Sequence, residues 1–145
     1  MAESVRDSII VSAPADVVRR TVTDLMSYPQ WQPEITSVEV LEIDAEGLTT
    51  KARFTIDARL LTVTCTLAYA YDAAGMRWWL VDGEGLARND GSYLVCDLGG
   101  GRTELTYELT VEPTVSVPAV LRRQIAKRIV DGALRGAKER AEGAA

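Results

Sequence analysis

Four side chains of this sequence are suited to hydrogen-bond chemistry on a small molecule. They are three phenols in segments of strand-like alternation and one guanidinium beside a tryptophan pair: Tyr69, Tyr71, Tyr107 and Arg77. Phenols and guanidinium groups donate hydrogen bonds, so they could orient a carbonyl group or hold an enolate. The sequence contains no histidine, which removes the commonest general base and metal ligand. We therefore expect no metal and no cofactor, and any catalysis would lack a visible base.

The two cysteines, Cys65 and Cys96, fit neither a disulfide framework nor a zinc site. We interpret both as small buried hydrophobic residues rather than reactive thiols. The sequence shows no secretory signal pattern and no apolar run of the roughly 20 residues that a membrane-spanning helix needs. These features predict a cytoplasmic protein without stable membrane insertion.

The length and charge predict one globular domain over residues 1–145 that does not bind nucleic acid. A chain of 145 residues that is 47% apolar and 26% charged has an ordinary globular composition. Its net charge of −5 opposes contact with a polyanion, which requires a concentrated basic surface. The basic cluster between Arg122 and Arg128 is expected to be a solvated helix face; contact with an anionic membrane surface is a weaker alternative.

Seven strands and three helices are expected from periodicity and turn residues. A first helix begins at Pro14, and Pro29 and Pro33 limit a short second one. Clusters of Gly, Asp and Asn, including Asn89–Gly91, indicate turns between strands. The strands are expected near 5–11, 36–44, 48–58, 60–71, 76–82, 87–98 and 102–112. Connections this short favour antiparallel pairing.

The last segment, from Ala119 to about Glu142, is expected to be a long helix with one apolar face. Gly132 and Gly136 lie inside it although each costs about 1 kcal/mol relative to alanine. We expect these glycines to let the helix lie close to the sheet.

Ordered motifs over nearly the whole chain resemble the START-like, or polyketide cyclase/dehydrase, superfamily. They include APADVV at 13–18, the turn YPQW at 28–31, the triplet GSY at 91–93 and GRTELTYEL at 101–109. The resemblance is greatest to a branch near the coenzyme Q-binding subgroup. It implies an α+β helix-grip fold, in which a seven-stranded curved antiparallel sheet wraps around a long C-terminal helix. Two short helices follow the first strand, and a hollow lies between sheet and helix.

Strand alternation predicts which side chains face that hollow, because neighbouring residues point to opposite faces. The carboxylates of the clear strands fall on the polar face. Of the tryptophan pair we place Trp79 inside, because Asp82 shares a side with Trp78; Arg77 is a possible inward charge. The predicted ligand contacts are Trp31, Phe54, Ile56, Cys65, Leu67, Tyr69, Trp79, Tyr107, Leu109, Leu121 and Ile125.

An apolar hollow with a few phenols is typical of a small-molecule site. We therefore expect a carrier or sensor for a lipid, isoprenoid quinone or polyketide-like molecule, acting as a monomer or weak homodimer. Two alternatives remain open. One is an aromatase/cyclase in which Tyr69, Arg77 and Tyr107 hold a polyketide chain in a reactive shape. The other is a protein-interaction module, a role that the resemblance also implies because some members of the superfamily are partners of chaperones or ribosomes.

Overall fold

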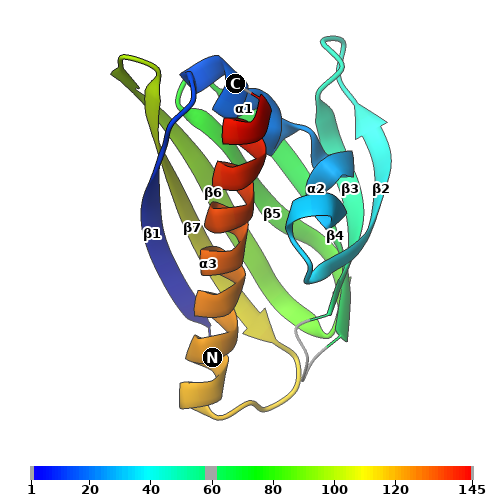
Figure 1. Ribbon diagram of the computed structural model, residues 1–145. Coiled ribbons are helices and arrows are strands. Elements are labelled where there is room, and N and C mark those ends of the chain that lie inside the picture. Colours follow the sequence, from blue (N-terminus) through cyan, green and yellow to red (C-terminus); the bar gives the residue numbers. More distant parts are fainter. Residues whose placement is uncertain (1, 58–61, 145) are drawn as a thin grey trace.

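The computed structural model describes residues 2–57 and 62–144, and within them one sheet of seven antiparallel strands faces a long helix (Figure 1). The strands are β1 (Glu3–Val11), β2 (Ile35–Ile43), β3 (Thr49–Asp57), β4 (Thr62–Asp72), β5 (Gly75–Glu84), β6 (Leu86–Gly99) and β7 (Arg102–Pro113). Their order across the sheet is β1-β7-β6-β5-β4-β3-β2. The strand number and pairing confirm the expected helix-grip fold. The boundary predicted between 58 and 60 lies outside the described residues.

Three short helices connect β1 to β2 along the chain. They are α1 (Ala15–Thr23), the 3-10 helix η1 (Leu25–Ser27) and α2 (Tyr28–Trp31). Pro14 precedes α1, and its carbonyl oxygen accepts bonds from the backbone N–H groups of Val17 and Val18, both at 3.1 Å. The predicted proline-started helix is therefore present, one residue later than expected.

The C-terminal helix α3 (Ala119–Ala144) lies on the concave face of the sheet (Figure 1). Its closest backbone approaches are to β1 and β7 on one side and to α1 and α2 at its C-terminal half. The middle strands β3 to β5 curve round without a comparable approach to the helix. Because the helix leans on one edge of a curved sheet, space remains between it and the middle strands.

Gly136 brings α3 close to α2, not to the sheet as we expected. A Cβ atom at this position would lie 2.0 Å from the carbonyl oxygen of Trp31. The nearest atom to a Cβ at Gly132 is a carboxylate oxygen of Glu34, at 3.6 Å. The small residue required at 136 therefore serves the contact between the two helices.

A β-bulge in β5 reverses the predicted orientation of the tryptophan pair. The register against β4 shifts at this point, so that Val81 is an extra residue and Asp82 no longer shares a face with Trp78. Trp78 is inside with 6% of its surface exposed, whereas Trp79 is 42% exposed on the outer face. Arg77 is also exposed. The inward placement of Trp79 was therefore wrong, and Arg77, considered as a possible inward charge, faces outward.

Candidate functional site

The space beneath α3 is a cavity whose walls come from β2 to β7, α2 and the segment after it, the segment after β7 and the first half of α3. The cavity has a volume of about 90 Å³ and is partly open to solvent. Its walls are largely apolar: Ile35, Phe54, Ile56, Val63, Leu67, Leu86, Leu109, Val111, Ile125 and Ile129 all contribute.

Seven of the eleven predicted ligand contacts line this cavity. They are Phe54, Ile56, Leu67, Tyr69, Tyr107, Leu109 and Ile125. They come together because the alternating residues of β3, β4 and β7 face α3, as the alternation predicted. Their contact with a ligand stays a prediction.

The other four predicted contacts lie elsewhere. Trp31 packs edge-on against Tyr28, with ring centroids 5.0 Å apart, and its indole N–H donates to Ser27 Oγ at 3.0 Å. This fixes α2 as a plug against the core. Cys65 is buried behind the cavity wall, and Leu121 is half-buried on α3 outside the lining. Trp79, as described above, points away.

Several lining residues were not predicted from the sequence. The aromatic and polar ones among them are Tyr28, Gln32, Glu34, Trp78, Asn89, Tyr93 and Arg122. Tyr93 follows the inward parity of β6 and could have been found by alternation. Asn89 was assigned to a turn, but it lies inside β6 and is buried. Gln32, Glu34 and Arg122 lie outside the strands, where alternation gives no signal.

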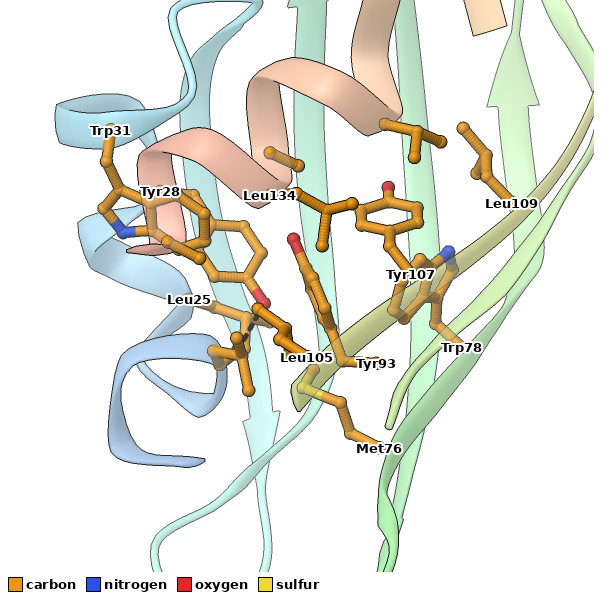
Figure 2. Packing of buried hydrophobic residues seen from close by; sticks show 14 of the residues in the cluster. Leu25, Tyr28, Trp31, Met76, Trp78, Tyr93, Leu105, Tyr107, Leu109 and Leu134 are labelled. Carbon is orange, nitrogen blue, oxygen red and sulfur yellow. Dashed lines mark hydrogen bonds between the residues drawn. The ribbon is translucent and has the colours of Figure 1, made fainter. Parts of the chain in front are cut away.

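Three aromatic side chains that line the cavity, Trp78, Tyr93 and Tyr107, pack against one another (Figure 2). The Tyr93 and Tyr107 rings meet edge-on with centroids 4.7 Å apart, and Trp78 lies 5.5 Å from each of them. Edge-to-face packing of this kind adds to the energy of burial and restricts the rotamers of all three rings. The wall is thus preformed.

The buried phenols are neutral hydrogen-bonding groups, not bases. Burial raises the pKa of Tyr28, Tyr69, Tyr93 and Tyr107, and neighbouring phenols raise the first three further. At neutral pH these hydroxyls therefore keep their protons. The carboxylate among the lining residues, Glu34, is 3.8 Å from the guanidinium of Arg128. The phenols can orient a ligand, and the one carboxylate among the described lining residues is engaged in this ion pair.

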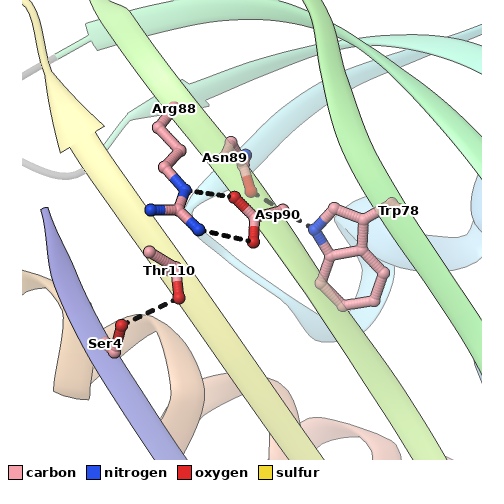
Figure 3. Close-up of polar contacts among 6 residues, drawn as sticks. All are labelled: Ser4, Trp78, Arg88, Asn89, Asp90 and Thr110. Carbon is pink, nitrogen blue, oxygen red and sulfur yellow. Dashed lines mark hydrogen bonds and ion pairs between the residues drawn. The ribbon is translucent and has the colours of Figure 1, made fainter.

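A polar chain runs through the wall behind the aromatic cluster. The indole N–H of Trp78 donates to Asn89 Oδ1 at 3.2 Å (Figure 3), and Asn89 Nδ2 lies 3.9 Å from Cys65 Sγ. Burial raises the pKa of the Cys65 thiol to about 11, and the contact with Asn89 opposes that rise. Cys96, by contrast, is exposed on the outer face of β6. Our expectation that both cysteines are buried was wrong for Cys96, because even-numbered residues at this end of β6 face outward.

We predict that the folded protein reacts quickly with one equivalent of a thiol reagent such as Ellman's reagent at about pH 8. Cys96 is accessible, whereas Cys65 is 1% exposed and protonated at that pH. The absorbance of the released thiolate would show one fast equivalent in buffer and two in denaturant. Cys96→Ser should abolish the fast phase; two fast equivalents in buffer would contradict the burial of Cys65.

Three buried polar atoms have no hydrogen-bond partner among the described residues: Gln32 Nε2, Tyr93 Oη and Arg122 Nε. All three residues line the cavity. Buried polar atoms are nearly always paired, so each unpaired one requires an explanation. Because all three residues line the cavity, we expect the explanation for their unpaired atoms to lie in what the cavity binds.

Comparison with known families places this cavity in context. Residues 2–142 match the sequence family described as polyketide cyclase/dehydrase and lipid transport. No match was found among curated protein sequences.

Solved structures with the same fold are similar over nearly the whole chain. A START superfamily protein from Mycobacterium smegmatis has a TM-score of 0.89 and 23% identity, covering 98% of this chain and 99% of that one. The ZhuI aromatase/cyclase from Streptomyces sp. R1128 has a TM-score of 0.80 and 19% identity, covering 98% and 94%. The di-domain aromatase/cyclase BexL has a TM-score of 0.71 and 20% identity, covering 97% of this chain and 46% of that one. At these identities the similarity shows the fold.

Among the described helices, none combines the length and apolar character required to cross a membrane.

Proposed function

Because the chain belongs to the polyketide cyclase/dehydrase and lipid transport family, we propose that it binds a hydrophobic small molecule in the cavity beneath α3. Family and fold support hydrophobic ligand binding or a cyclase-type function. Within that range we infer a carrier or sensor that works in the cytoplasm as a monomer or weak homodimer. The supporting observation is a preformed cavity with mostly apolar walls.

The chemistry of the lining favours binding over catalysis. Of the three donors considered for a cyclase, Tyr69 and Tyr107 line the cavity but Arg77 lies outside it. The two phenols keep their protons and can orient a carbonyl oxygen, but they cannot remove a proton. A cyclase remains the second candidate, because ring closure can be accelerated by holding a reactive chain in shape.

Filling the cavity tests the binding proposal directly. Ile125 lines the cavity, so we expect Ile125→Trp to occupy it and to weaken binding of the fluorescent probe phenylnaphthylamine about tenfold or more. Val120, on the same helix, is 72% exposed and outside the lining, so Val120→Trp should leave the affinity within about twofold. Equal affinities for both variants and the original protein would overturn binding in this cavity.

Denaturing mass spectrometry of the purified protein separates the two candidates. A co-purifying lipid-like molecule, lost in Ile125→Trp and retained in Val120→Trp, supports the carrier. Absence of a co-purifying molecule, together with a changed product distribution when the protein is added to a polyketide synthase reaction, supports the cyclase.

A further inference from the structure

The unpaired polar atoms of the cavity impose requirements on its ligand. Arg122 Nε and Gln32 Nε2 can only donate hydrogen bonds, and Tyr93 Oη can donate or accept. A hydrocarbon would leave all three unpaired and would bury them further. A ligand with oxygen acceptors would satisfy them, so the lining favours an oxygen-bearing ligand.

Arg122 lines one end of the cavity, and its Nε–H is the unpaired donor that a ligand could use. Its Nη2 lies 3.4 Å from a carboxylate oxygen of Glu3, and its Nη1 donates to the carbonyl oxygen of Val117 at 2.8 Å. The Arg122 and Glu3 side chains are only 14% and 15% exposed. The other Glu3 carboxylate oxygen lies 3.8 Å from Arg123, whose side chain is 60% exposed and therefore solvated. Because Glu3 is then the counter-charge of the buried Arg122 guanidinium, the buried Nε is suited to one neutral oxygen rather than to a free carboxylate.

Gln32 and Tyr93 form the second polar position. They are 4% and 1% exposed, so water outside the protein does not reach them. The Gln32 side chain approaches the Tyr93 hydroxyl and, by donating toward it, counters part of the rise that burial causes in the pKa of Tyr93. The contact does not have the geometry of a full hydrogen bond, so Gln32 Nε2 and Tyr93 Oη both lack a partner among the described residues. One acceptor placed between these two adjacent groups would satisfy both.

The sheet register separates the two polar positions along the cavity. Glu3, the partner of Arg122, pairs across the sheet with Val111, whereas Tyr93 pairs with Tyr107. Val111 and Tyr107 are four residues apart on β7, which corresponds to about 13 Å along a strand. A molecule that reaches both positions must therefore be elongated, on the scale of two or three fused or linked rings.

We propose that the ligand is an elongated, mostly apolar molecule with a neutral oxygen acceptor at each end, one bound by Arg122 and the other by Gln32 and Tyr93. This inference rests on the proposed binding function and specifies its ligand class. A fatty acid, with oxygens at one end only, would leave the donors at the other end unpaired. Donors left unpaired in a buried site discriminate strongly against such a ligand.

A matched series of biphenyls tests the proposal by titration calorimetry. The probes are para,para′-diacetylbiphenyl, with a ketone at each end; para-acetyl-para′-ethylbiphenyl, with one; and para,para′-diethylbiphenyl, with none. We expect each ketone to tighten binding about fivefold to tenfold, as one hydrogen bond to a buried donor does. Equal affinity for the diacetyl and diethyl compounds would overturn the proposal while leaving hydrophobic binding intact.

Two conservative variants assign the ends. Tyr93→Phe keeps the ring and removes the unpaired hydroxyl, and Arg122→Lys keeps a cation for Glu3 and removes Nε–H. Each should lower the affinity for the diacetyl compound about fivefold and change that for the diethyl compound less than about twofold. Weakening of both probes to the same extent would indicate a merely structural role and overturn the assignment. If the original protein binds none of the three probes, the proposed function fails as well.

Discussion

We expect the folded protein to keep its phenols protonated until it unfolds in alkali, between about pH 11 and 12. The sequence has five tyrosines, and four of them are buried in one core. Burial raises the pKa of Tyr28, Tyr69, Tyr93 and Tyr107 well above the ordinary value. The fifth, Tyr71, is partly buried and has its pKa raised to about 12.

The direction of the effect follows from which state holds the proton. Below about pH 10 the phenols are neutral in both states, so the full stability is present. Above that pH the unfolded chain loses protons that the folded chain retains, and stability falls. Each such group costs about 1.4 kcal/mol at pH 11 and about 2.7 kcal/mol at pH 12. Four groups together approach the 5–15 kcal/mol that stabilises a typical domain.

Near-ultraviolet phenolate absorbance and circular dichroism, recorded on the same alkaline titration, check this expectation. The two signals should change together in one steep transition. Phenolate formation near pH 10 with unchanged circular dichroism would contradict it. Tyr93→Phe is the control, because its hydroxyl has no partner: it should raise the alkaline midpoint and increase neutral-pH stability by about 1 kcal/mol.

The strands could be predicted from the sequence because their faces differ so clearly. In β7 the alternate residues Leu105, Tyr107, Leu109 and Val111 are apolar and buried, as the period of two requires. Alternation along β3, β4 and β7 therefore located most of the apolar wall. Where a strand keeps an unbroken period, its sequence contains the orientation of its side chains.

The rest of the site depends on a bulge, on strand pairing and on a long-range ion pair, and none of these can be deduced from the sequence of a single strand. A bulge at Val81 reverses parity in β5, and nothing in the local sequence marks it. Asn89 has the residue type of a turn, but its pairing with Val111 of β7 keeps it within β6, where its side-chain oxygen accepts the Trp78 N–H. Arg122 reaches the cavity because Glu3, 119 positions earlier, comes beside it in the folded chain. Such long-range pairings become visible only in three dimensions.

The cavity exists because α3 is held by its neighbours rather than by the middle of the sheet. Its C-terminal half rests on α1 and α2, and its sheet contacts are concentrated on β1 and β7. The tight contact with α2 sets how the helix leans. Changing that contact should therefore alter both the stability and the cavity.

We expect Gly136→Ala to lower the free energy of unfolding by about 2–4 kcal/mol. Alanine favours a helix by about 1 kcal/mol over glycine, so helix propensity alone predicts the opposite sign. The added Cβ would lie 2.0 Å from the carbonyl oxygen of Trp31 and 3.1 Å from its ring. Because the first of these atoms is backbone, α2 or α3 must move as a unit, and the clash outweighs the gain.

Gly132→Ala is the matched control, one turn earlier on the same helix. Its Cβ would meet only a Glu34 carboxylate, at an ordinary contact distance of 3.6 Å, so the variant should gain up to about 1 kcal/mol. Urea unfolding of both variants measures the difference, and stabilisation by both substitutions would contradict the close contact. Gln32 directly follows α2, so the shift forced by Gly136→Ala should also weaken binding of diacetylbiphenyl, while Gly132→Ala should not. A loss of affinity confined to the variant that displaces α2 would tie the helix contact to the shape of the cavity.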